Sequence, residues 1–338
     1  MSKYNLIVTF TAVFLSYTLL ITIVFAQPTA NVLVQSTGKI LYDVLPWYGT
    51  GEVPWMEQPT KEAVYAEWER VLTKMAKWSF NTERLYIYPN MDLASAGRID
   101  YVFIDDMISL FASHGMKTII DIHHAGYSGG NYVYGYFGSN QWIQDCRDLA
   151  TRYKGNPNVV ALELFNEPFV TEEWDSTTVK DYPDIFKMYA VCTDAVRAID
   201  PNRTVIWGDP LLSNVIPWDD LTQPSVIELY KAYAANMWFA FHRYPPVLPT
   251  PERPWLGVQV LFSSMDYVMA KGFNVWLGEF GPYPTFSDAE NRQFVLQCIN
   301  YCMSRNIGFS LWEYRIDHRC TPGLYDDVLE QSNYARAL

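Results

Sequence analysis

The chain has 338 residues, of which 49% are hydrophobic, and its formal net charge at pH 7 is -12. Such a composition can bury a large core, which argues against intrinsic disorder. The length suits either one large α/β barrel or two small domains. The negative charge argues against nucleic acid and anionic membrane surfaces as partners, because both repel an acidic protein.

The first 26 residues have the pattern of an export signal. Lys3 gives a positively charged start, an apolar run extends over residues 6–25, and Val24 and Ala26 precede the expected cleavage point. We therefore expect residues 1–26 to be a signal peptide and the mature protein to be secreted. The apolar run is also long enough to span a bilayer. The alternative is an uncleaved N-terminal membrane anchor, with the rest of the chain outside the cell.

After residue 27, short β-rich runs alternate with amphipathic stretches, and Pro, Gly and Asn separate them. The β-rich runs are nearly continuous apolar segments, as expected for strands buried on both faces. We expect strands at residues 42–48, 82–88, 118–123, 159–167, 204–207, 237–244, 274–280 and 308–314. We expect helices at residues 61–76, 101–114, 140–153, 184–199, 224–235, 256–270 and 287–305.

This alternation predicts an α/β fold, a (β/α)8 TIM barrel that spans residues 27–338 as a single domain. An open doubly wound sheet is the alternative, but no glycine-rich phosphate loop follows any of the expected strands. Nothing indicates an internal repeat or a linker to a second module, and we expect a monomer.

The cysteines do not indicate metal or redox chemistry. The chain has five of them, so at least one is either free or in an intermolecular bond, and no CxxC pair occurs. Buried free thiols are the expected state, with a Cys146–Cys192 bridge between neighbouring helices as the alternative. We expect no metal and no organic cofactor.

Two glutamates lie at the ends of expected strands, Glu167 in the sequence Leu-Phe-Asn-Glu-Pro and Glu279 in Leu-Gly-Glu-Phe-Gly. A buried carboxylate is costly unless partners compensate for its lost hydration. Each glutamate alone could simply cap a strand or pair with an arginine. Two in one barrel instead suggest a carboxylate pair for acid, base or nucleophilic chemistry.

Further polar and aromatic residues lie on or at the ends of the same kind of strand: Arg84, His123, His242, Tyr244 and Trp312. Active groups of barrel enzymes gather at the carboxyl ends of the strands. Each residue alone would be better explained by packing, but their shared position is not. Glu163 and Asp121 point inward as well. We expect Glu163 about 13 Å below the rim, at ~3.3 Å per residue, where both carboxylates act as partners inside the barrel.

Together, six short strings make the chain resemble glycoside hydrolase family 5, the cellulase family of barrel enzymes with catalytic glutamates at the ends of strands four and seven. The resemblance covers about residues 40–325, with one string for each of six expected strands. The strings are Asn-Thr-x-Arg-Leu (81–85), Asp-Ile-His-His (121–124), Phe-Asn-Glu-Pro (165–168), His-Arg-Tyr (242–244), Gly-Glu-Phe-Gly (278–281) and Leu-Trp (311–312).

The resemblance implies that Glu167 is the general acid/base and Glu279 the nucleophile of a retaining mechanism. Asn166 would hold the 2-hydroxyl of the sugar at the cleavage point. Such a mechanism needs the two carboxyls about 5–5.5 Å apart, one protonated and one ionised. Burial and the partner's charge would raise the pKa of the acid toward ~6–7.

The resemblance also assigns the surrounding subsite. Arg84 and Tyr244 would hydrogen-bond Glu279, and their charge and hydroxyl would lower its pKa. His123 and His242 would line the subsite, and Trp312 would form its floor by stacking.

The sequence predicts the substrate less directly than it predicts the catalytic residues. Aromatic residues crowd the loops after the strands, and we expect Trp207 and Trp174 to be stacking platforms beside a mobile loop at residues 127–138. An endo-acting enzyme on β-1,4-glucan, a β-linked polysaccharide, is the leading prediction. A β-mannanase or an exo-acting β-glucosidase of the same family is the alternative. A non-catalytic carbohydrate-binding barrel belongs to a different class, and it predicts the loss of one of the two glutamates.

Overall fold

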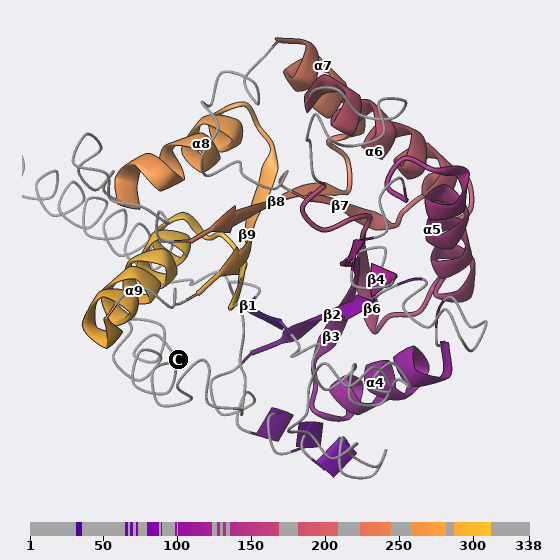
Figure 1. Cartoon of the computed structure of the whole chain (residues 1–338), viewed down its shortest axis with the longest axis horizontal. Helices are drawn as coiled ribbons and strands as arrows, with labels where there is room; N and C mark the ends of the chain where they lie inside the picture. The colour runs from indigo at the N-terminus through magenta and orange to yellow at the C-terminus, as the bar shows by residue number, and fades with distance from the viewer. Residues whose placement is uncertain are drawn as a thin grey trace, which may run out of the picture.

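A closed barrel of parallel strands, surrounded by helices, makes up most of the described chain (Figure 1). The computed structural model describes residues 32–35, 65–66, 68–69, 72–73, 80–87, 89, 99, 101–123, 127–128, 131–132, 136–168, 182–208, 224–244, 258–281 and 287–311. The predicted α/β barrel is confirmed for these residues.

The barrel is closed in the order β1-β10-β9-β8-β7-β6-β3-β2, so that the first and last strands pair with each other. Its strands are β1 (Val32–Gln35), β2 (Thr82–Ile87), β3 (Lys117–Ile122), β6 (Val159–Glu163), β7 (Thr204–Gly208), β8 (Met237–Arg243), β9 (Asn274–Phe280) and β10 (Phe309–Leu311). A separate two-stranded antiparallel sheet pairs β4 (Tyr127–Ser128) with β5 (Asn131–Tyr132).

The helices lie outside the barrel and connect successive strands (Figure 1). They are α4 (Tyr101–Ser113), α5 (Asn140–Arg152), α6 (Tyr182–Arg197), α7 (Pro224–Tyr233), α8 (Val258–Ala270) and α9 (Asp288–Arg305). Ser287 begins α9 with a capping box, in which its side chain accepts from the Glu290 amide and Glu290 accepts from the Ser287 amide. Such caps satisfy amides that have no partner within the helix.

One predicted strand lies outside the described residues, and another ends four residues earlier than expected. The strand expected at residues 42–48 lies outside the described residues, and β1 occupies the barrel position between β10 and β2. The strand expected at residues 159–167 ends at Glu163, so Glu167 follows the strand and is not part of it. The positive φ of 40° at Glu167 is incompatible with an extended strand.

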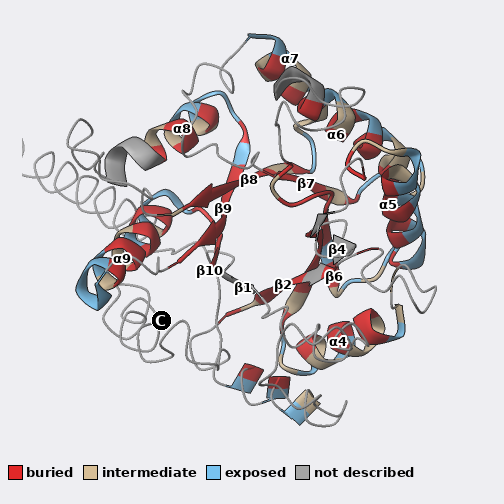
Figure 2. Ribbon diagram, viewed as in Figure 1, coloured by how far each residue is buried: buried red, intermediate tan, exposed pale blue. Residues whose placement is uncertain are grey.

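The barrel interior and the layer between barrel and helices are separate apolar clusters. The interior cluster consists of Ile119, Ala161, Ile206, Ala240 and Trp276, all nearly inaccessible to solvent. A larger cluster packs the outer faces of the strands against the helices, and Figure 2 shows buried residues along both the strands and the inner faces of the helices. The strands are therefore buried on both sides, as their continuous apolar sequences predicted.

A bulge in β9 changes which residues point inward. Phe241 pairs with Leu277 but His242 pairs with Glu279, so β9 has one extra residue at Gly278. A Cβ at Gly278 would lie 2.9 Å from the Ala240 Cβ and 3.1 Å from His242 Nε2. Glycine therefore allows the bulge, which brings Glu279 level with His242 on the inner face.

The described cysteines are four buried free thiols, as expected: Cys146, Cys192, Cys298 and Cys302. Among the described residues, no helix has the length and apolar character needed to cross a membrane. The expected signal or anchor at residues 1–26 lies outside the described part of the chain.

Candidate active site

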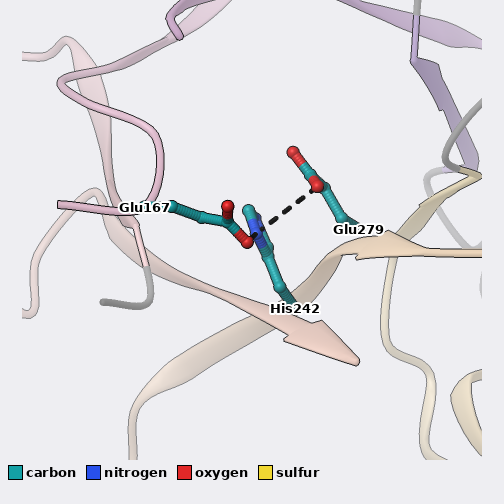
Figure 3. Close-up of side chains that lie close together, drawn as sticks. All are labelled: Glu167, His242 and Glu279. Atoms are coloured by element: carbon teal, nitrogen blue, oxygen red, sulfur yellow. Dashed lines mark hydrogen bonds and ion pairs between the residues drawn. The ribbon is translucent and has the colours of Figure 1, made fainter. Parts of the chain in front are cut away.

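Glu167, His242 and Glu279 meet at the carboxyl end of the barrel (Figure 3). His242 Nδ1 lies 2.6 Å from Glu167 Oε1 and 3.6 Å from Glu279 Oε2. One ligand atom from each of the three residues lies within 4.8 Å of the other two. The two glutamates singled out from the sequence therefore share one site, although 112 positions separate them in the chain (279 − 167).

Glu279 lies at the end of β9, only 3% exposed, and both of its carboxylate oxygens accept hydrogen bonds. Arg84 Nη1 donates to Oε1 at 3.0 Å and the Tyr244 hydroxyl donates to Oε2 at 2.8 Å. Both predicted partners of Glu279 are thus confirmed.

The predicted lowering of the Glu279 pKa is wrong in its net direction. Burial raises the pKa of Glu279 above its ordinary value, and Glu167 adds to that rise. His242, Arg84 and Tyr244 act in the opposite direction, but they do not outweigh the cost of removing the carboxylate from water.

Arg84 is the centre of a buried network of charges. Its Nε and Nη2 donate to Glu163 at 2.5 and 2.7 Å, and Nη2 also lies 3.0 Å from Asp121. Burial raises the pKa values of Asp121 and Glu163 to about 7, while Arg84 opposes the shift. One guanidinium therefore faces three carboxylates, and burial raises the pKa values of two of them toward neutral pH.

Glu163 and Asp121 are partners inside the barrel, as predicted, but Glu163 lies nearer to the site than expected. The depth of about 13 Å assumed a strand that stays extended as far as Glu167. Because β6 ends at Glu163, one guanidinium joins Glu163 directly to Glu279.

Asn166 and His123 lie beside this network, both almost completely buried. Asn166 Oδ1 accepts from Arg84 at 2.8 Å, and its Nδ2 lies 3.4 Å from His123 Nε2. His123 Nδ1 lies 2.8 Å from Asp121, and burial holds the pKa of His123 well below its ordinary value. His123 is therefore a neutral ring whose orientation is set by Asp121. The shared strand parity of Asp121 and His123 already contained this signal.

The predicted platform at Trp207 needs correction. Its side chain is completely buried between barrel and helices, stacked on Tyr189 at 5.6 Å, and its indole nitrogen donates to Thr193. A buried ring cannot offer its face to a sugar. Ile206 points into the barrel, so its neighbour Trp207 points outward.

Three other predicted features lie wholly or partly outside the described residues. Trp174 and Trp312 are not described, so their roles stay predictions. Of the loop at residues 127–138, the structure describes the paired strands β4 and β5 and residues 136–138.

The same three side chains, Glu167, His242 and Glu279, are the described group whose spacing would also suit a metal ion. Their chemistry, one imidazole and two carboxylates, is common among ligands of divalent cations. His242 Nδ1 is already hydrogen-bonded to Glu167, so a metal ion would have to replace that hydrogen bond.

Two site residues escaped prediction from the sequence, Trp142 on α5 and Tyr189 on α6. Trp142 Nε1 donates to the Leu164 carbonyl at 2.7 Å, and the Tyr189 hydroxyl donates to the Phe165 carbonyl at 2.6 Å. Both hold the backbone just before Glu167. Their helical patterns indicate only a buried face, and no local motif reveals which carbonyl they reach.

A parallel barrel with a buried glutamate, a partly exposed glutamate and a histidine at the carboxyl end of its strands is the architecture of a barrel glycoside hydrolase. The chain belongs to the cellulase family, glycosyl hydrolase family 5, whose family model matches residues 46–317. It is therefore a glycoside hydrolase of the cellulase type.

Known relatives agree with this family. An endoglucanase of Paenibacillus polymyxa is 23% identical, over 88% of this chain and 81% of that protein. The major extracellular endoglucanase of Xanthomonas campestris is 25% identical, over 77% of this chain but only 59% of that protein. The crystal structure of endoglucanase Cel5A from Thermotoga maritima has the same fold, with a TM-score of 0.58 and 17% identity over 78% of this chain and 88% of that one.

Proposed function

We propose that the protein is a secreted, retaining endo-β-glycosidase that hydrolyses β-1,4-glucan through a covalent glycosyl-enzyme. The observation that carries this proposal is the short distance between Glu167 and Glu279, whose nearest ligand atoms lie within 4.8 Å. Retaining enzymes hold their carboxyls about 5–5.5 Å apart, whereas inverting enzymes leave about 6.5–9.5 Å for a water molecule.

In the first step, Glu279 attacks the anomeric carbon and Glu167 gives its proton to the glycosidic oxygen. The bond between the anomeric carbon and that oxygen breaks, and an ester bond to Glu279 forms. Glu167 reaches the site from a backbone outside the sheet, and its side chain is 20% exposed. That exposure is compatible with contact to the leaving sugar.

In the second step, a water molecule gives a proton to Glu167 and attacks the anomeric carbon of the intermediate. The ester bond breaks, Glu279 leaves as a carboxylate, and the configuration at the anomeric carbon is retained. His242, 2.6 Å from Glu167, is close enough to orient this carboxyl in both steps.

The neighbouring residues have supporting roles in this proposal. Arg84 and Tyr244 stabilise the Glu279 carboxylate that burial disfavours. Arg84 and His123 fix the amide of Asn166, whose Nδ2 carries a second hydrogen that would donate to the 2-hydroxyl of the sugar. Neutral His123 borders the same subsite, and Trp312 and Trp174 are proposed as stacking surfaces.

Endo action on glucan is favoured because the two relatives matched over more than three quarters of this chain are named endoglucanases. Relatives named probable glucan 1,3-beta-glucosidase match only 35–38% of the chain. Secretion follows from the N-terminal pattern, and the Xanthomonas relative is itself named extracellular. We further propose that residues 27–338 form one monomeric domain.

The test is Glu167→Ala, assayed with an unactivated cello-oligosaccharide and with dinitrophenyl β-cellobioside. Loss of a general acid lowers kcat/KM about 10²–10⁴-fold, but only for the substrate whose leaving group needs protonation. We expect that loss for the oligosaccharide and a much smaller one for the aryl glycoside. Equal losses on both substrates would rule out the acid role.

Product analysis with the unmodified protein complements this test. NMR should show the β-anomer first if configuration is retained, and the α-anomer first would indicate inversion. Glucan, mannan and xylan tested in parallel distinguish the glucanase from the mannanase. Binding without any product would indicate a carbohydrate-binding barrel.

A further inference from the structure

The backbone between the end of β6 and Glu167 is held partly by donors from two outer helices. Beyond Glu163, the last residue of β6, the Leu164 carbonyl accepts from Trp142 Nε1 at 2.7 Å and the Phe165 carbonyl accepts from the Tyr189 hydroxyl at 2.6 Å. Figure 1 shows α5 and α6, which carry these donors, side by side outside the barrel. The amides of this segment still donate to the neighbouring strands, from Leu164 to the Ile206 carbonyl and from Asn166 to the Ile122 carbonyl, whereas the Leu164 and Phe165 carbonyls are held from the helix layer.

Tyr189 also ties this segment to β7. The Gly208 amide, at the end of β7, donates to the Tyr189 oxygen at 3.1 Å while that hydroxyl donates to Phe165. The hydroxyl therefore bridges two backbones at a point where the sheet has opened. A Cβ at Gly208 would lie 2.5 Å from the Phe165 carbonyl oxygen, so only glycine lets the two chains approach this closely.

The Tyr189 side chain has little freedom to move. It is completely buried, its ring is stacked on Trp207, and Phe137 packs against its edge at 5.2 Å. Burial also raises the pKa of the phenol well above its ordinary value, so it stays protonated and continues to donate. The bridge to Phe165 is therefore rigid.

Glu167 needs such support because its backbone is in an unfavourable conformation. Its φ of 40° is in the left-handed region, which non-glycine residues rarely adopt unless the surroundings enforce it. Phe165 lies two residues earlier. We propose that Tyr189 is a positioning residue for the catalytic acid/base, acting through the Phe165 carbonyl to hold Glu167 where it can protonate the glycosidic oxygen.

This inference depends on the proposed role of Glu167, and it predicts a specific kinetic pattern. Misplacement of a catalytic group by about 1 Å can cost 10²-fold in rate. Removal of the Tyr189 hydroxyl should impair proton donation, whereas attack by Glu279 on β9 should continue. The loss should therefore depend on the leaving group.

The experiment is Tyr189→Phe in the full chain, assayed for kcat/KM on the unactivated cello-oligosaccharide and on dinitrophenyl β-cellobioside. We expect about a tenfold loss on the oligosaccharide and less than about twofold on the aryl glycoside. Tyr301→Phe is the matched control, because it removes a tyrosine hydroxyl that donates to the Phe262 carbonyl and Asp266 outside the site. The control should change neither value.

Trp142→Phe is a second variant that removes the neighbouring donor to Leu164, and it decides the question if Tyr189→Phe does not fold. It should show the same dependence on the leaving group. Equal losses on both substrates, or no loss, would overturn the positioning role. If Glu167→Ala shows the leaving-group pattern and both positioning variants do not, only this inference fails. If Glu167→Ala lacks the pattern, the proposed function fails first.

Discussion

Two layers of the barrel interior differ sharply in chemistry although the same strands build them. The lower layer is apolar, with Ile119 on β3, Ala161 on β6 and Ala240 on β8. Two residues further along the same strands, Asp121, Glu163 and His242 form the polar layer at the carboxyl ends. Because side chains alternate in a strand, the two layers lie on one face, one above the other.

The comparison separates residues that stabilise the fold from residues that serve chemistry. The apolar layer removes hydrocarbon from water, which stabilises the barrel. The polar layer buries one guanidinium among three carboxylates, which costs hydration energy that the ion pairs only partly recover. We expect substitutions in the two layers to have opposite signatures, and the predictions below test that difference.

The largest effect should come from Glu279→Gln in the polar layer. We expect kcat/KM to fall by at least about 10³-fold, since deletion of a covalent nucleophile in other enzymes costs more than that. The melting temperature should stay nearly unchanged, because the amide keeps the shape of the side chain and Arg84 keeps Glu163 and Asp121 as partners. Enzyme assays and calorimetry provide the two measurements, and Glu228→Gln on the exposed surface of α7 is the control. A large loss of stability would make Glu279 a structural residue.

The apolar layer should respond in the opposite way to Ile206→Ala. We expect the free energy of unfolding to fall by about 2–5 kcal/mol, the usual cost of a cavity in a packed core. The value of kcat for the folded fraction should change little. Urea denaturation measures the loss, and Val191→Ala, at a position 55% exposed on α6, is the matched control with almost no effect. A drop in kcat without loss of stability would contradict the division between layers.

The smallest effect concerns the pH dependence of stability. Burial raises the pKa of Glu163 to about 7, against 4.5 as its ordinary value. Above pH 4.5 the unfolded chain releases a proton that the native protein keeps, so rising pH favours unfolding until about pH 7. Each such proton contributes up to about 1.4 kcal/mol per pH unit.

Glu163→Gln should remove this contribution and flatten the stability curve between those pH values. The measurement is the free energy of unfolding at several pH values. Asp121 remains in the variant and keeps part of the slope, since burial raises its pKa to about 7 as well. Identical slopes for the variant and the unmodified protein would show that Glu163 is already ionised in the native barrel.

The sequence predicted most barrel elements because hydrophobic runs and turn residues are local signals. Strand β9 was predicted with its observed bounds, and most other described strands differ only at their ends. Local patterns failed where the chain departs from a regular strand. The turn before Glu167 and the bulge at Gly278 each depend on a neighbouring strand or helix, so no alternation within a single segment reveals them.

The candidate site shows the same division. Glu167, Glu279, Arg84 and Tyr244 could be chosen from the sequence because each lies on or near the end of an expected strand. The prediction of a stacking platform at Trp207 was wrong because its side chain lies on the outer face of the strand, where it packs against helices and is buried. The contacts of Trp142 and Tyr189 could not be predicted from the sequence. Their side chains donate to carbonyls of a distant segment, and only the packing of the helices on the barrel brings them together.

The sequence by itself determined the family, the barrel and the two glutamates, because short motifs and alternating elements are written in consecutive residues. The tertiary structure decided how the charges balance. Only the closed barrel brings Arg84 between Glu163 and Glu279. Burial, together with the nearby Glu167, raises the pKa of Glu279 despite its arginine partner. Hydration and distance depend on residues far apart in the chain, so the electrostatics of the site required the fold.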